Sequence, residues 1–260
     1  MKQDKNIYIG GYQQIDPHID YRVFEVKLGK GSKWFRGPEP KTNNFISCIG
    51  AAQTWGRLCE KSYPQLFTEL SGIDAFNISL GGFDLRSFHL NFLYDKINSS
   101  KFCVLQIMSG RCQRIPSRGI FKATNKYHFK DGSKQTSCEY WSKQFKEMSS
   151  LECEQALQEL NDLYVNSYKK IISKIKVPII LLYVGNKQPH EDDFFKSKKV
   201  STQFPHWISA NSVKLIKKMC KYYIEEIYNE NTLNNYYPVQ STYEFISAKL
   251  FARANEWGLL

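Results

Sequence analysis

The sequence lacks long apolar runs. No stretch approaches the roughly 20 apolar residues that a helix needs to cross a bilayer. The longest run, VPIILLYVG at 177–185, has the length of a buried strand. The first residues, MKQDKNIYIGG, carry charge and no apolar segment of the kind that marks a secretion signal. We therefore expect a soluble, cytoplasmic protein without a membrane span.

The chain also lacks cysteine pairs of the CxxC type. Its 7 cysteines form an odd set, and several have apolar neighbours, as buried reduced thiols do. We expect neither a zinc site nor a disulfide framework. The segment HEDD at 190–193 has residue types that bind metals, but consecutive carboxylates in a polar loop are normally solvated. The prediction is no metal and no cofactor.

Acidic residues are outnumbered by basic ones, which gives a net charge of +11. This excess is compatible with a nucleic-acid surface, with an anionic substrate, or with a lysine-rich composition alone. The denser basic groups, KSKK at 196–199 and KLIKKMCK at 214–221, fall in an expected loop and on the solvent face of an expected helix. No RRM, helix-turn-helix or zinc-finger pattern is present, so nucleic acid is the less favoured partner.

What the chain does have is a regular alternation of elements. With 42% hydrophobic residues, the 260 residues can form one large α/β domain. Four apolar strand patterns alternate with helical patterns, and the strands read NFISCIG, DAFNISLGG, KFCVLQIMSG and VPIILLYVG. The helical pattern at 57–72 ends at Gly72, a plausible C-cap. The predicted fold is a doubly wound, flavodoxin-like or SGNH-like three-layer sandwich around a central parallel sheet.

Three segments stand outside the alternation or extend it. Residues 1–44 are predicted to be an N-terminal extension packed on the main domain, which spans 45–260. Residues 111–150 lack clear periodicity and are predicted to form an insertion, or lid, at the carboxyl edge of the sheet. The 204–230 segment has apolar residues at helical spacing, namely Val213, Ile216, Cys220, Tyr223 and Ile227. A final helix is expected to run through Phe245, Leu250 and Phe251.

Three strand ends are expected to meet at the carboxyl edge, and they read GAAQTWG, NISLGG and MSGR. Their order and spacing resemble the SGNH, or GDSL-like, hydrolase superfamily, whose first block is Gly-Asp-Ser-x-Thr-x-Gly. Its second block places Asn or Gly after the next strand, and its third is Gly-x-Asn-Asp. The residues that match these blocks or occupy their places are Gly50, Thr54, Gly56, Asn77, Gly81, Gly82, Ser109, Gly110 and Arg111.

The departures from that resemblance matter for chemistry. Ala52 falls where the superfamily carries its serine nucleophile, and Ala51 falls where it carries aspartate. A methyl group cannot attack a carbonyl carbon, so the serine-ester mechanism cannot run from position 52. Arg111 stands in the third block, where a guanidinium suits bidentate capture of carboxylate, phosphate or sulfate.

Two segments compete for the last block, usually Asp-x-x-His. STQFPHW offers His206, with Gln203 at the aspartate position, and NNYYPVQSTYEF offers Tyr243. The chain also resembles, over about residues 20–250, a bacterial family without an assigned activity in which FRGP, GAAQTWG, MSGR and YYP recur in this order.

Each candidate has a structural alternative. The Gly50–Gly56 turn is either a compact strand-to-helix connection or a set of amides that hold an anion at a helix N-terminus. Arg111 either forms a surface ion pair or faces a pocket. His206 either packs beside aromatic side chains or acts as a base. Ser109 is the one hydroxyl that would replace the missing nucleophile.

The favoured hypothesis is a binding or transfer protein on an SGNH-like scaffold, and whether it is an enzyme stays open. We expect it to recognise an anionic or carbohydrate-derived small molecule or glycan. The resemblance implies acyl or sulfuryl transfer in surface polysaccharide assembly, by analogy only. The alternative is a hydrolase that uses Ser109 or a water activated by His206. The predicted ligand-binding residues are Ala51, Ala52, Gln53, Thr54, Asn77, Gly82, Arg111 and Tyr243, and the predicted catalytic residues are His206 and Ser109.

Overall fold

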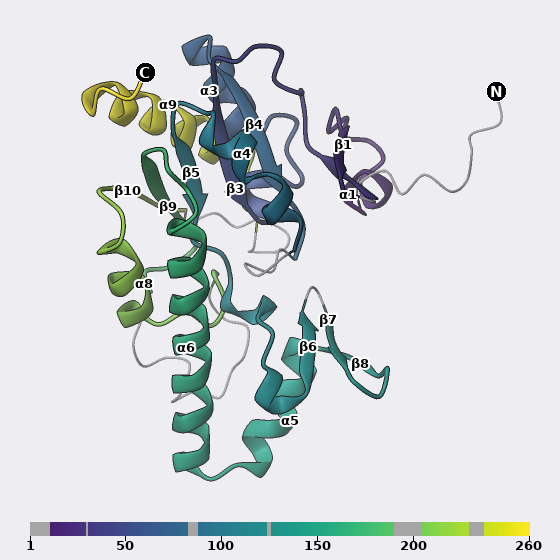
Figure 1. Cartoon of the computed structure of the whole chain (residues 1–260). Helices are drawn as coiled ribbons and strands as arrows, with labels where there is room; N and C mark the ends of the chain where they lie inside the picture. The colour runs from purple at the N-terminus through teal and green to yellow at the C-terminus, as the bar shows by residue number, and fades with distance from the viewer. Residues whose placement is uncertain (1–10, 30, 83–87, 124–125, 190–203, 229–236) are drawn as a thin grey trace, which may run out of the picture.

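The computed structural model (Figure 1) describes residues 11–29, 31–82, 88–123, 126–189, 204–228 and 237–260. Its centre is a five-stranded parallel sheet in the order β10-β9-β5-β3-β4. The strands are β3 (Phe45–Gly50), β4 (Asp74–Ser79), β5 (Cys103–Gln106), β9 (Ile179–Gly185) and β10 (Tyr222–Ile227). Counted along the chain, this is a 2-1-3-4-5 arrangement, which is flavodoxin-like. The predicted doubly wound α/β fold is confirmed.

Side chains alternate along the strands between two apolar cores, one on each face of the sheet. On β3, Phe45 and Ile49 face one core, and Ile46 and Cys48 face the other. Helices α4 (Tyr94–Asn98), α6 (Ser150–Ile172) and α8 (Ala210–Lys217) supply the first core, and α3 (Tyr63–Ser71) and α9 (Gln240–Glu256) supply the second. The three layers follow from strands that are apolar on both sides.

Local signals explain where several helices begin and end. Helix α3 begins beside Pro64, which is tolerated in a first turn, and ends at Gly72 with φ 70°, as predicted. The expected helix at 57–72 is thus shorter, and a separate helix α2 (Ala52–Trp55) precedes it. Helix α6 begins at a capping box formed by Ser149 and Glu152.

One sequence expectation is wrong. The helical spacing over 204–230 predicted one helical face, but α8 ends at Lys217 and the chain continues as strand β10. Strand β10 is only half buried, and it lacks the continuous apolar run that marks the other four strands of the sheet. The final helix, α9, runs through Phe245, Leu250 and Phe251 as expected. Its buried side carries Tyr243, Ile246, Leu250 and Ala254, and Phe245 is 56% exposed.

The segment before β3 packs against the sheet edge and the first turn. It contains α1 (Gly11–Ile15) and a hairpin of β1 (Phe24–Leu28) with β2 (Gly31–Phe35). Phe24 and Phe35 contact Phe76 of β4, with ring centroids 6.0 and 6.1 Å away. This end of the chain is thereby placed beside the strand ends that form the site.

The 111–150 segment forms a small unit around a third core, which it shares with the first half of α6. It contains short 3₁₀ helices η2 (Gly110–Cys112) and η3 (Pro116–Arg118), the antiparallel sheet β6 (Ile120–Ala123), β7 (Lys126–Phe129) and β8 (Lys134–Thr136), and α5 (Ser137–Glu147). Figure 1 shows it below the parallel sheet, beside the first half of α6. Trp141 of this core meets Trp207 edge-on at 5.9 Å. A role as a lid stays a prediction.

Candidate functional site

The turn after β3 is built on a close approach of side chains to the backbone. A Cβ atom at Gly50 would overlap Thr54 Oγ1 and Gln106 Oε1, so only glycine fits there. Helix α2 follows at once and ends at Gly56, whose φ is 78°. The small residues of this turn therefore serve packing, whatever else they do.

Gln106, at the end of β5, holds that turn in place. Its Oε1 accepts hydrogen bonds from Ala51 N (2.9 Å), Thr54 N (3.3 Å) and Thr54 Oγ1 (2.7 Å). Its Nε2 donates to Gln53 Oε1 at 3.2 Å. Fewer backbone N–H groups of the turn than predicted can therefore face a ligand, because the Ala51 N–H donates to Gln106 inside the fold. Sequence reasoning missed Gln106, although a glutamine inside an apolar strand is a visible signal.

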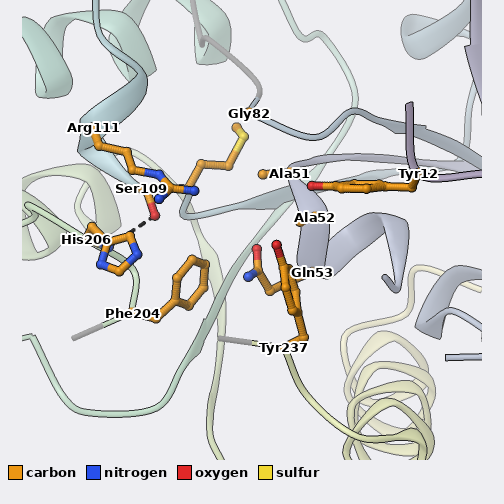
Figure 2. Close-up of a pocket in the computed structure, with 11 residues that line it drawn as sticks. Tyr12, Ala51, Ala52, Gln53, Gly82, Ser109, Arg111, Phe204, His206 and Tyr237 are labelled. Carbon is orange, nitrogen blue, oxygen red and sulfur yellow. Dashed lines mark hydrogen bonds between the residues drawn. The ribbon is translucent and has the colours of Figure 1, made fainter. Parts of the chain in front are cut away.

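A pocket of ≈ 580 Å³, including its solvent-open part, lies at the carboxyl ends of β3 and β5 (Figure 2). This is the position where the strand order reverses, the place where such sheets bind ligands. Seven of the predicted residues line it: Ala51, Ala52, Gln53, Gly82, Ser109, Arg111 and His206. Four that the sequence did not indicate also line it: Tyr12, Met108, Phe204 and Tyr237.

Arg111 provides the positive charge of the pocket. It follows β5 in η2, and Figure 2 shows its guanidinium turned toward the pocket. Within the described part of the chain, Arg111 forms no ion pair and no hydrogen bond. A guanidinium in this state can bind an anionic group of a ligand.

Two buried tyrosines of α6 fix the strand end that leads to Arg111. Tyr168 Oη donates to the Gln106 carbonyl (2.8 Å) and accepts from Met108 N (2.7 Å), and Tyr164 Oη donates to the Met108 carbonyl. Burial raises the pKa of Tyr164 and of Tyr168 well above the usual value, so both hydroxyls stay protonated. Two hydroxyls of α6 thus hold the backbone at the end of β5, next to the pocket.

His206 and Ser109 are joined through the backbone. The His206 N–H donates to Ser109 Oγ (3.1 Å), the dashed line in Figure 2, and the Gly110 N–H donates to the His206 carbonyl (2.8 Å). The His206 ring is 4% exposed and packs edge-on against Phe204 at 5.6 Å. The Ser109 hydroxyl therefore anchors the segment that carries His206.

Three predicted ligand-binding residues lie away from the pocket lining. Thr54 is fully buried and bonded to Gln106. Asn77 donates to the Thr54 carbonyl (2.9 Å) and accepts from Ser79. Tyr243 lies on the buried side of α9 in the second core, and burial raises its pKa. Of the two candidates for the last block, His206 lines the pocket and Tyr243 does not.

Arg36, from the FRGP segment, is a fully buried arginine that fixes the α2–α3 connection. Its Nη1 donates to the Gly56 carbonyl (2.6 Å), and its Nη2 donates to the carbonyls of Cys59 (2.9 Å) and Glu60 (2.5 Å). Burial lowers the pKa of Arg36 to about 10. Its bonds are all to carbonyl oxygens, so it positions the backbone rather than a ligand.

Metal-type residues do not gather in the described ranges. No group of three or more His, Cys, Asp or Glu side chains there is placed to hold a metal ion. The segments 190–193 and 196–199, and Gln203, lie outside the described residues. In the same ranges, no helix has the length and apolar character needed to cross a membrane.

Comparison with known proteins gives a match to a family model over part of the chain, and similarity to solved structures at low sequence identity. The model of a family described as "Domain of unknown function (DUF6473)" matches residues 12–114, which include Tyr12 and Arg111 but not His206 or Tyr237. A comparison with curated proteins found no match.

Among solved structures, a carbohydrate acetylesterase family member from Sinorhizobium meliloti is 9% identical with a TM-score of 0.45, over 82% of this chain and 98% of that one. An inhibitor-bound aryl esterase from M. smegmatis is 7% identical with a TM-score of 0.42, over 84% and 100%. A putative lipolytic protein of the G-D-S-L family from Desulfitobacterium hafniense is 13% identical with a TM-score of 0.38, over 80% and 98%.

Proposed function

We propose that the pocket binds an anionic group of an acyl, sulfuryl or sugar-derived ligand, with Arg111 as the principal contact. The observation that carries the proposal is the Arg111 guanidinium, which lines the pocket and forms no ion pair with any described residue. A positive charge beside a concave surface attracts anions more strongly than one exposed to bulk solvent.

The neighbouring residues support binding without a covalent intermediate. Ala51 and Ala52 present methyl groups to the pocket at the positions that resemble the aspartate and the serine of the first block. If transfer occurs, His206 takes the proton of an acceptor hydroxyl, and the oxygen of that hydroxyl attacks the group to be transferred. The bond between that group and its leaving group breaks as the new bond forms. A glycan hydroxyl as acceptor, and surface polysaccharide assembly as the setting, stay predictions of the sequence.

Binding of simple anions tests this function. Isothermal titration with sulfate, phosphate and acetate at constant ionic strength should show binding that Arg111→Gln weakens by about 10- to 100-fold, since hydrogen bonds to charged groups contribute about 1.5–3 kcal/mol. Arg253→Gln is the matched control, because Arg253 lies exposed on α9 and pairs with Glu256. Equal affinities in wild type and Arg111→Gln would contradict the proposal.

The alternative hydrolase makes a different prediction. If Ser109 is a relocated nucleophile, hydrolysis of a p-nitrophenyl ester should be lost in Ser109→Ala. We favour binding or direct transfer, because Ser109 Oγ already accepts the His206 backbone N–H.

A further inference from the structure

The pocket has two chemically different sides. Figure 2 shows Arg111, Ser109 and His206 on one side, and Tyr12 and Tyr237 on the other, with both tyrosine hydroxyls toward the Ala51–Ala52 turn. A small inorganic anion bound to Arg111 would not explain why the opposite side of the pocket carries two tyrosines.

Arg57 holds the two tyrosine rings in place. Its guanidinium carbon lies 4.6 Å from the Tyr12 ring centroid and 5.0 Å from that of Tyr237. Its Nη1 donates to Tyr237 Oη at 3.0 Å, and its Nε donates to Asp16 Oδ2 at 3.2 Å. The rings are therefore fixed by cation–π contacts and an ion pair before any ligand arrives.

The direction of the hydrogen bond between Arg57 and Tyr237 determines whether the Tyr237 hydroxyl can donate to a ligand. A guanidinium only donates, so Tyr237 Oη is the acceptor and keeps its own proton for another partner. Burial raises the pKa of Tyr12 well above its usual value, and so does the neighbouring Tyr237 hydroxyl, to which the protonated Tyr12 hydroxyl donates a hydrogen bond. Tyr237 Oη thus accepts from both Arg57 and Tyr12, and its own O–H group faces ligand hydroxyl, ether or carbonyl oxygens.

Gly81 and the apolar side chains of the pocket leave a surface that suits a compact ring. A Cβ atom at Gly81 would come within 2.5 Å of Tyr12 Oη, so glycine at 81 is what admits the Tyr12 hydroxyl. The methyls of Ala51 and Ala52, together with Met108 and Phe204, form apolar surface between the two sides. Such a surface suits the C–H face of a saturated ring whose edges carry oxygen atoms.

We infer that the ligand is an acidic sugar, whose anionic group binds Arg111 and one of whose neutral oxygens accepts a hydrogen bond from Tyr237. The inference rests on the proposed function and adds the chemical class of the ligand. Tyr237 is its specificity-determining residue, and Arg57 is a positioning residue that acts through Tyr237.

Titration with matched probes tests it. D-glucuronate and D-glucose 6-sulfate carry both an acid and a sugar ring, whereas acetate and sulfate carry the acid alone. At least one acidic sugar should bind about tenfold more tightly than the corresponding simple anion. Tyr237→Phe keeps the ring and removes one hydroxyl, so it should weaken acidic-sugar binding by about 3- to 10-fold and leave acetate and sulfate binding unchanged. Tyr223→Phe is the control, because its hydroxyl bonds Glu225 on β10 and does not line the pocket.

The outcomes separate the two proposals. If sulfate or acetate binds through Arg111 but neither acidic sugar binds more tightly, or Tyr237→Phe changes nothing, the sugar inference is overturned and the anion site remains. If no anion binds and Arg111→Gln has no effect, both proposals fail. Thermal melting checks that each variant is folded, and Tyr12→Phe serves as the second variant if Tyr237→Phe is not.

Discussion

Two polar regions lie next to each other at the carboxyl edge of the sheet, and they differ in where their hydrogen bonds go. Beneath the first turn, Gln106, Thr54, Asn77 and Ser79 bond one another and the backbone, all buried. Across the pocket, Arg111 has no such internal partner among the described residues. Residues at motif positions thus stabilise the turn, whereas the charge that faces the pocket comes from a departure from the motif.

Replacing Gln106 should break the first region most severely. Gln106→Leu leaves the amides of Ala51 and Thr54 and the Thr54 hydroxyl without their acceptor, and a buried unsatisfied group costs about 1–3 kcal/mol. We expect the free energy of unfolding to fall by about 3–5 kcal/mol in urea denaturation. Gln158→Leu, on the exposed side of α6, is the control. A loss below about 1 kcal/mol would show that the network is not what holds the turn.

Alkaline pH should weaken the support beneath the second region. Burial raises the pKa of Tyr164 and Tyr168 in the folded state, whereas the unfolded value is about 10. Above pH ~10 the unfolded chain loses protons that the folded chain keeps, so stability falls as pH rises, by about 1.4 kcal/mol per tyrosine and pH unit. Urea denaturation between pH 8 and about pH 11 should show a shallower decline for Tyr168→Phe. The same slope in both proteins would contradict this assignment.

Thr54→Val should have the smallest effect on stability of these changes, and it separates the two regions most clearly. It removes one hydroxyl bond to Gln106 (2.7 Å) without changing the pocket lining. We expect Thr54→Val to lower the free energy of unfolding by about 1–2 kcal/mol and to leave sulfate affinity unchanged. Arg111→Gln should instead lower sulfate affinity and leave the free energy of unfolding unchanged. A change in sulfate affinity in Thr54→Val would mean that Thr54 contacts the ligand, as the motif alone had suggested.

The fold was largely predictable because four strands are buried on both faces. Their continuous apolar runs, from NFISCIG to VPIILLYVG, distinguish them from helices and reveal the alternation. Strand β10 was missed because it carries two glutamates, Glu225 and Glu226, and so lacks that run, and because its apolar residues match a helical spacing that begins in α8. The other edge strand, β4, is buried along most of its length and was predicted.

The site was predictable where residues directly follow inner strands. Ala51, Ala52 and Gln53 after β3, and Ser109 and Arg111 after β5, converge because parallel strands end at one edge. Thr54 and Asn77 point beneath the turn, which depends on the Gln106 network rather than on spacing. Tyr12 and Tyr237 were missed, because their partnership through Arg57 is formed only when distant segments pack together.

The separation of Tyr12 and Tyr237 along the chain has a consequence for biosynthesis. Synthesis proceeds from the N-terminus, so a nascent chain can pair Tyr12 with Arg57 long before Tyr237 leaves the ribosome. The parallel sheet, through β10, is also translated before Tyr237. A growing polypeptide therefore carries an incomplete binding surface until its last segments are made, and a product that stops short of residue 237 would lack both Tyr237 and α9, the helix that covers one face of the sheet.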